Sequence, residues 1–132
     1  MKLFLAIAAI LAWIFGLGQL LAPAKFYAPM GVEFTPMLAT IAQTLGANLF
    51  GLGVINWCAR QAQGRGLTAV LLGNLFVQVL SLAVVFRILS LGAGKIAAPG
   101  VVIHVVLGAF FLFFWLRARK QESAQVSAAA RP

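Results

Sequence analysis

Four long apolar segments constrain this chain more than any other feature of its sequence. They cover residues 3–22, 37–57, 67–91 and 98–116, and each is close to the roughly 20 residues that a helix needs to cross a bilayer. A backbone surrounded by lipid must satisfy its own hydrogen bonds, and an α-helix does so within one segment. We therefore predict four transmembrane helices, with residues 1–116 forming one membrane domain.

The composition leaves little room for a soluble domain. Of the 132 residues, 63% are hydrophobic and 9% are charged, whereas about a quarter of the residues of a typical soluble domain are charged. The connections between the apolar segments are short, so sequential helices are expected to pack as antiparallel neighbours. The sequence thus predicts an all-α polytopic membrane protein, built as an antiparallel bundle of four transmembrane helices.

The first segment has an alternative interpretation as a cleaved signal peptide. Ala22, Pro23 and Ala24 give the small-x-small pattern of a cleavage site, but the apolar run exceeds the roughly 7–15 residues of a signal-peptide core, which favours a retained helix. In the following loop, residues 23–36, three prolines discourage a continuous helix. The loop is also apolar, and we expect it to lie on the outer interface or to fold over the mouth of the bundle.

The basic residues indicate the orientation of the chain in the membrane. With a cytoplasmic N-terminus, most of them lie inside and few lie outside, as the positive-inside rule requires. The predicted inner residues are Lys2, Arg60, Arg65, Arg117, Arg119, Lys120 and Arg131, and the outer ones are Lys25 and Lys95. Both termini are therefore predicted to be cytoplasmic. The inner rim is expected to attract anionic lipid, and the scattered charge does not form the basic face of a nucleic-acid-binding protein.

Residues 117–132 form a tail that is small and polar, without apolar periodicity. A segment of this kind cannot bury enough apolar surface to offset the entropy of ordering it. It is predicted to be a disordered basic cytoplasmic tail.

The second segment is the most polar of the four. At 100° per residue one of its faces carries Thr40, Gln43, Thr44, Ala47 and Gly51. Polar side chains in hydrocarbon need protein partners, and the last two residues form a small-xxx-small pair that permits close helix contact. We interpret the segment as the inner helix of the bundle. Its polar face is expected to meet a stripe on the third segment formed by Asn74, Gln78 and Ser81.

Three polar residues are predicted to lie at similar depth in the outer half of the bundle, namely Gln43, Arg87 and His104. Arginine can hold a carboxylate, phosphate or quinone oxygen, histidine can donate a hydrogen bond or relay a proton, and glutamine can orient a ligand. The three are the candidate ligand-binding residues. Two alternatives stay open: Arg87 can extend its guanidinium to the headgroups, and His104 can be a hydrogen-bonded packing residue.

Familiar catalytic and metal-binding patterns are absent from the sequence. The chain has two acidic residues and one cysteine, Cys58, which rules out an intrachain disulfide and a cysteine-based metal cluster. There is no P-loop, GxSxG or HExxH motif. A single histidine without a C-x-x-C-H motif argues against haem. The sequence therefore predicts no catalytic residue, no metal and no cofactor, and it favours a protein that is not an enzyme.

Two runs carry a resemblance to a known group of proteins. LLAPAKFYAPMG at residues 20–31 is followed by AQTLGANLFGLGVINWCAR at residues 42–60 and by two further apolar segments. This pattern, over roughly residues 3–116, resembles a family of small four-helix bacterial inner-membrane proteins with a domain of unknown function. The resemblance implies a multi-pass protein of the bacterial plasma membrane and no established activity. In that family the position of Gln43 is often arginine, and this chain departs from it.

These features lead to two functional hypotheses. The first is a structural or accessory subunit that packs against a larger membrane complex, or against itself, through small-residue and aromatic faces. The alternative is a binding or transport module that holds a small anionic or quinone-like lipophile between Gln43, Arg87 and His104.

Overall fold

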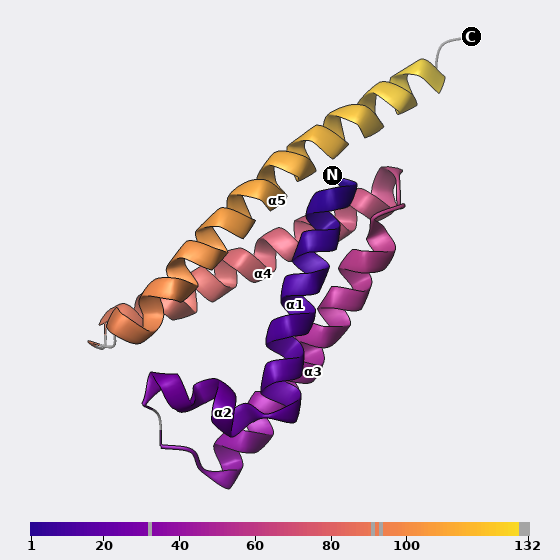
Figure 1. The fold of residues 1–132 in the computed structure, drawn as a ribbon. Helices are drawn as coiled ribbons and strands as arrows, with labels where there is room; N and C mark the ends of the chain where they lie inside the picture. The colour runs from indigo at the N-terminus through magenta and orange to yellow at the C-terminus, as the bar shows by residue number, and fades with distance from the viewer. Residues whose placement is uncertain (32, 91, 93, 130–132) are drawn as a thin grey trace. The chain divides into compact units, whose positions relative to one another are not determined.

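The chain is almost entirely helical in the computed structural model, which describes residues 1–31, 33–90, 92 and 94–129. Four helices are long and apolar enough to cross a membrane, as predicted, and the fold is that of an all-α multi-pass membrane protein. The long helices are α1 (Lys2–Leu21), α3 (Pro36–Ala59), α4 (Gly64–Ser90) and α5 (Gly94–Ala129) (Figure 1). Between α1 and α3 lie the short helix α2 (Pro23–Tyr27) and the 3-10 turn η1 (Ala28–Met30).

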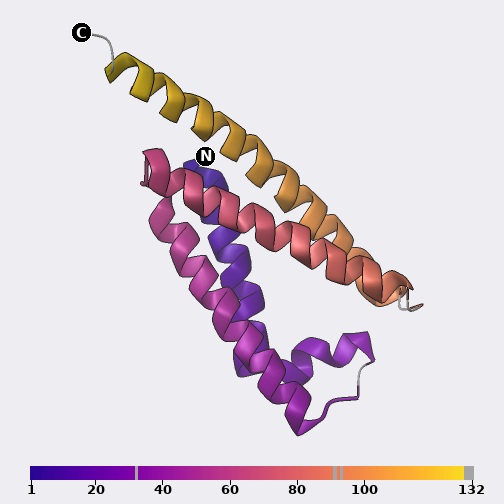
Figure 2. The same cartoon turned by 180° about the vertical axis from the view of Figure 1, so that it is seen from behind.

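The helices divide into two compact units, Met1–Gln61 and Ala62–Pro132. We call them hairpin 1 and hairpin 2. Hairpin 1 packs α1 against α3, and hairpin 2 packs α4 against α5. Within each hairpin the two long helices run antiparallel, as Figures 1 and 2 show from opposite sides. Each hairpin is described by itself below.

Hairpin 1 is held together where two glycines let the backbones approach closely. A Cβ added to Gly16 would lie 2.8 Å from the backbone nitrogen of Phe50, and one added to Gly46 would lie 2.7 Å from the carbonyl oxygen of Gly16. Two turns further along α3, a Cβ on Gly53 would lie 2.5 Å from the indole ring of Trp13. No side chain fits at these points. Close van der Waals contact of this kind is a main source of helix association in membranes.

The face that α3 turns toward α1 is a different face from the one that carries Ala47 and Gly51, which the sequence predicted to meet the third segment. Gly51 has nothing within 4 Å of an added Cβ, and Ala47 is exposed. The physical reason is that a contact this close requires positions without a Cβ on the same face. Gly46 and Gly53 satisfy that condition because they are seven residues, about two turns, apart.

Hairpin 2 has a more conventional side-chain core. Leu71 of α4 and Phe111 of α5 are almost completely buried. Asn74 and Gln78 of α4 are buried as well, with 3% and 5% of their surface exposed. An added Cβ on Gly108 of α5 would lie 3.4 Å from the Cβ of Gln78, so the two helices are in ordinary contact at that level.

The last helix extends much further than the sequence predicted. Instead of a disordered tail from residue 117, the structure continues α5 through Ala129. Two physical reasons account for this. The tail is rich in arginine, glutamine and alanine, which favour helix, and it extends a helix that is already nucleated, so each added residue gains a backbone hydrogen bond. Residues 130–132, including the predicted inner-rim residue Arg131, lie outside the described residues.

Candidate functional site

A hydrogen-bonded polar pair, Gln19 and Tyr27, lies at the end of hairpin 1 where α1 ends. Gln19 has only 4% of its surface exposed. The hydroxyl of Tyr27 donates a hydrogen bond to Oε1 of Gln19 over 2.8 Å, and the Gln19 amide nitrogen donates to the carbonyl oxygen of Phe15 over 3.3 Å. Burial raises the pKa of Tyr27 above its ordinary value. The hydroxyl therefore remains a neutral donor at physiological pH.

The local sequence explains how Tyr27 reaches this position. Pro23 occupies the first turn of α2, where its missing N–H costs no hydrogen bond. The Phe26 ring fills the space that Gly18 leaves open, since a Cβ there would lie 2.7 Å from the ring. Phe34 then stacks on Tyr27 with ring centroids 6.5 Å apart. The loop thus folds back onto the end of its own hairpin.

Gln43 contacts the same end of hairpin 1 from the other helix. Its side-chain nitrogen donates to the carbonyl oxygen of Leu20 over 3.3 Å. Carbonyl groups in the last turn of a helix have no partner within the helix, and a side-chain donor can satisfy one of them. Gln43 therefore links α3 to the end of α1.

His104 lies in hairpin 2 and pairs with a residue that the sequence placed in a different interaction. Its Nδ1 lies 2.8 Å from Oε1 of Gln78. Because that oxygen accepts, Nδ1 carries the hydrogen in this arrangement, and Nε2 of the neutral ring is left as an acceptor. The Gln78–His104 bond therefore joins α4 to α5.

Arg87 is exposed near the end of α4, where the hydroxyl of Ser90 donates to its carbonyl oxygen over 2.7 Å. Among the described residues, no hydrogen bond or ion pair joins the Arg87 and His104 side chains. Gln43 belongs to hairpin 1 and the other two belong to hairpin 2. The three predicted ligand-binding residues are therefore not assembled within either hairpin.

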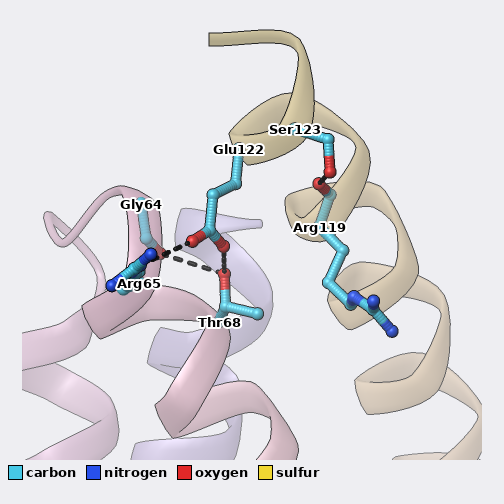
Figure 3. A network of polar contacts seen from close by, with 6 residues as sticks. All are labelled: Gly64, Arg65, Thr68, Arg119, Glu122 and Ser123. Carbon is cyan, nitrogen blue, oxygen red and sulfur yellow. Dashed lines mark hydrogen bonds and ion pairs between the residues drawn. The ribbon is translucent and has the colours of Figure 1, made fainter. Parts of the chain in front are cut away.

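A second polar network, which the sequence did not reveal, joins the start of α4 to the extension of α5 (Figure 3). Oε1 of Glu122 lies 3.5 Å from Nε of Arg65, and Oε2 lies 3.0 Å from the hydroxyl of Thr68. That hydroxyl also lies 3.0 Å from the carbonyl oxygen of Gly64, so its single hydrogen serves one acceptor at a time. A carboxylate near the first turn of α4 is also favoured by the helix dipole. The sequence contained one indication that Glu122 could matter, because it is one of only two acidic residues in the chain.

Arginine and tryptophan side chains pair near one end of each hairpin. The Arg60 guanidinium lies 3.2 Å from the centre of the Trp57 ring, and its Nε donates to the Trp57 carbonyl oxygen over 2.7 Å. In hairpin 2, the Arg119 guanidinium lies 5.0 Å from the centre of the Trp115 ring. Cation–π pairs that combine a charge with an amphipathic ring suit the membrane–water interface.

The four apolar helices and their contacts define the class of this protein. The chain is a multi-pass membrane protein whose helical hairpins satisfy many of their own polar groups. Among the described residues no cluster of three or more histidine, cysteine or acidic side chains is placed to hold a metal ion. No protein family, characterised protein or solved structure shows significant similarity to the chain.

Proposed function

We propose that this protein is a structural or accessory membrane subunit that associates laterally with other protein, either a larger membrane complex or further copies of itself. The observation that carries the proposal is a polar face on α3 that hairpin 1 leaves uncovered. Thr40, Thr44 and Asn48 are all exposed there. A polar face on a transmembrane helix is stabilised by contact with protein rather than lipid.

The polar contacts within the hairpins also support a structural role. Gln43 bonds to the backbone of α1, and His104 bonds to Gln78. Each of these bonds uses one polar atom of the side chain to join two helices of the same hairpin. The alternative of a binding or transport module that uses Gln43, Arg87 and His104 therefore remains a prediction from the sequence, and no described contact favours it.

We further propose that the hairpins form an antiparallel four-helix bundle in a bacterial inner membrane, with both termini cytoplasmic. The excess of basic residues near the chain ends and the α3–α4 connection supports this orientation. The Arg60–Trp57 and Arg119–Trp115 pairs then lie at the cytoplasmic rim, where the basic residues attract anionic lipid. Beyond residue 116, α5 would extend about 20 Å from the membrane.

Native mass spectrometry after gentle solubilisation tests the proposal. An affinity-tagged copy is purified from its native membrane, and untagged membranes serve as the control. The expected result is a particle of fixed stoichiometry that contains this chain with a second protein or with further copies of itself. A single copy that carries a discrete small molecule would contradict the accessory role and would support the ligand-binding alternative.

A further inference from the structure

A stack of side chains at one end of hairpin 1 holds an arginine over a tryptophan ring. Trp13 of α1 packs at the close contact with Gly53, where an added Cβ would lie 2.5 Å from the indole. The ring centroids of Trp13 and Trp57 lie 5.3 Å apart, and the guanidinium carbon of Arg60 lies 3.2 Å from the centre of the Trp57 ring. The close packing of α1 on α3 therefore positions Arg60 through two aromatic rings.

The bonding of Arg60 leaves the outer edge of its guanidinium available. Its Nε donates to the carbonyl oxygen of Trp57 over 2.7 Å, which satisfies a carbonyl group in the last turn of α3. No other acceptor for this guanidinium is found among the described residues. A guanidinium carries its N–H donors in a planar fork. The N–H groups of both terminal nitrogens are thus free to bind an acceptor from outside the hairpin.

The charge of Arg60 has no matching carboxylate side chain in the protein. The chain has two acidic residues. Glu122 pairs with Arg65, and Glu33 lies in the loop between α1 and α3, at the other end of hairpin 1 from Arg60. Because α1 and α3 are antiparallel, Lys2 at the start of α1 adds positive charge at the same end as Arg60 (Figures 1 and 2). This end of hairpin 1 therefore matches an anion.

The length of α3 places Arg60 at the level of the lipid headgroups. The helix has 24 residues and is about 36 Å long, whereas the hydrocarbon core of a bilayer is about 30 Å thick. Arg60 directly follows the last residue of this helix, so it lies outside the hydrocarbon in either orientation of the chain. The anion available at this depth is the phosphate of a phospholipid, which a guanidinium can bind through two parallel hydrogen bonds.

From this geometry we infer that Arg60, held over Trp57, binds the phosphate group of an anionic phospholipid. The inference rests on the basic rim described under the proposed function and names the residue that binds lipid there. It requires neither lateral association nor a particular orientation. The other basic residues of the rim attract anionic lipid through charge alone. Arg60 differs because its fork is held in place, and lysine cannot reproduce that fork.

Native mass spectrometry of the purified full-length chain with added lipid tests this site. Phosphatidylglycerol is the anionic probe, and phosphatidylcholine, whose choline offsets the phosphate charge, is the comparison. We expect the unaltered protein to prefer phosphatidylglycerol. Arg60→Lys keeps the charge and removes the fork, and it should weaken phosphatidylglycerol binding about tenfold. Arg117→Lys, the same change at an exposed arginine of α5, is the matched control and should leave binding unchanged.

Trp57→Leu tests the supporting ring. It keeps the arginine and removes the surface that holds the guanidinium, so we expect weaker binding of phosphatidylglycerol here as well. Circular dichroism confirms that each variant is folded. If Trp57→Leu does not fold, Arg60→Lys decides the result by itself.

Three outcomes would overturn the inference. Equal binding of the two lipids would show that the protein does not select an anionic headgroup. Equal effects of Arg60→Lys and Arg117→Lys would show that lipid is attracted by charge alone. Displacement of phosphatidylglycerol by an equal concentration of inorganic phosphate would identify a site for soluble phosphate. The number of protein chains is read from the same spectra, so failure of the lipid site is distinguished from failure of the proposed lateral association.

Discussion

Several polar residues in this chain form a hydrogen bond within their own hairpin. Gln43 bonds to the backbone of the adjacent helix end, and Tyr27 bonds to a glutamine that its loop reaches by folding back. His104 and Gln78 pair across hairpin 2. In a low-dielectric environment an unpaired amide or imidazole is costly, so such contacts fix the geometry of a hairpin even where each contributes little net free energy.

The Gln78–His104 bond can be measured with a double-mutant cycle. Gln78→Leu, His104→Leu and the double variant are unfolded with sodium dodecyl sulfate in mixed micelles, and the free energies of unfolding are compared. We expect a coupling of about 0.6 kcal/mol, the average for interhelical hydrogen bonds in a membrane. His104→Leu combined with Glu122→Gln, on the same helix but without a shared contact, should be additive. A coupling near zero for Gln78 and His104 would show that the bond does not stabilise the hairpin.

Helices pack in two different ways in this molecule. The α1–α3 pair depends on glycines that bring two backbones into contact, whereas the α4–α5 pair uses buried side chains such as Leu71 and Phe111. The extension of α5 gains a third kind of contact from Glu122, which reaches Arg65 and Thr68. Because Arg65 is 94% exposed, this ion pair contributes little free energy and mainly orients the end of the helix.

Two glycine substitutions can distinguish the contribution of close helix packing to stability from the contribution of helix propensity. Gly46→Ala places a methyl group against the backbone of α1, so we expect it to lower the free energy of unfolding by about 1–3 kcal/mol. Gly73→Ala is the matched control, because a Cβ at Gly73 meets nothing within 4 Å. That change should be neutral or slightly stabilising, since alanine favours helix more than glycine does. Equal effects of the two changes in micelle unfolding experiments would contradict the packing described for hairpin 1.

At the scale of the whole molecule, two helical hairpins are joined by a short basic connection. The sequence around this connection and around both chain ends carries most of the positive charge, while the loop between α1 and α3 carries Lys25 and Glu33. This asymmetry is the basis of the proposed orientation, because positively charged flanks are retained on the cytoplasmic side.

Cysteine labelling tests this orientation. Glu33→Cys and Gln121→Cys are made separately in a Cys58→Ser background, and both positions are exposed. A membrane-impermeant maleimide should label position 33 in intact spheroplasts and position 121 only in inside-out vesicles. Labelling after detergent lysis controls for the reactivity of each thiol. The reverse pattern would place both termini outside and would refute the assignment of the basic rim to the cytoplasm.

The sequence by itself determined the membrane class and the helices. Apolar runs of about 20 residues leave the backbone no alternative to helix in lipid, so four spans and an all-α fold were predictable. The residues at which the helices end were harder to predict from the sequence. The tail lacks the apolar periodicity that signals a packed helix, yet α5 continues to Ala129 because helix extension needs no new nucleus.

Only the tertiary structure decided which faces meet and which polar residues pair. Ala47 and Gly51 satisfied the small-residue pattern as well as Gly46 and Gly53 did, and a seven-residue glycine spacing was the one signal that could have separated them. Likewise Gln43, Arg87 and His104 had similar expected depth, but depth does not specify the direction of a side chain around its helix. That direction depends on the contacts between two particular backbones, which bring Gln43 to Leu20 and His104 to Gln78.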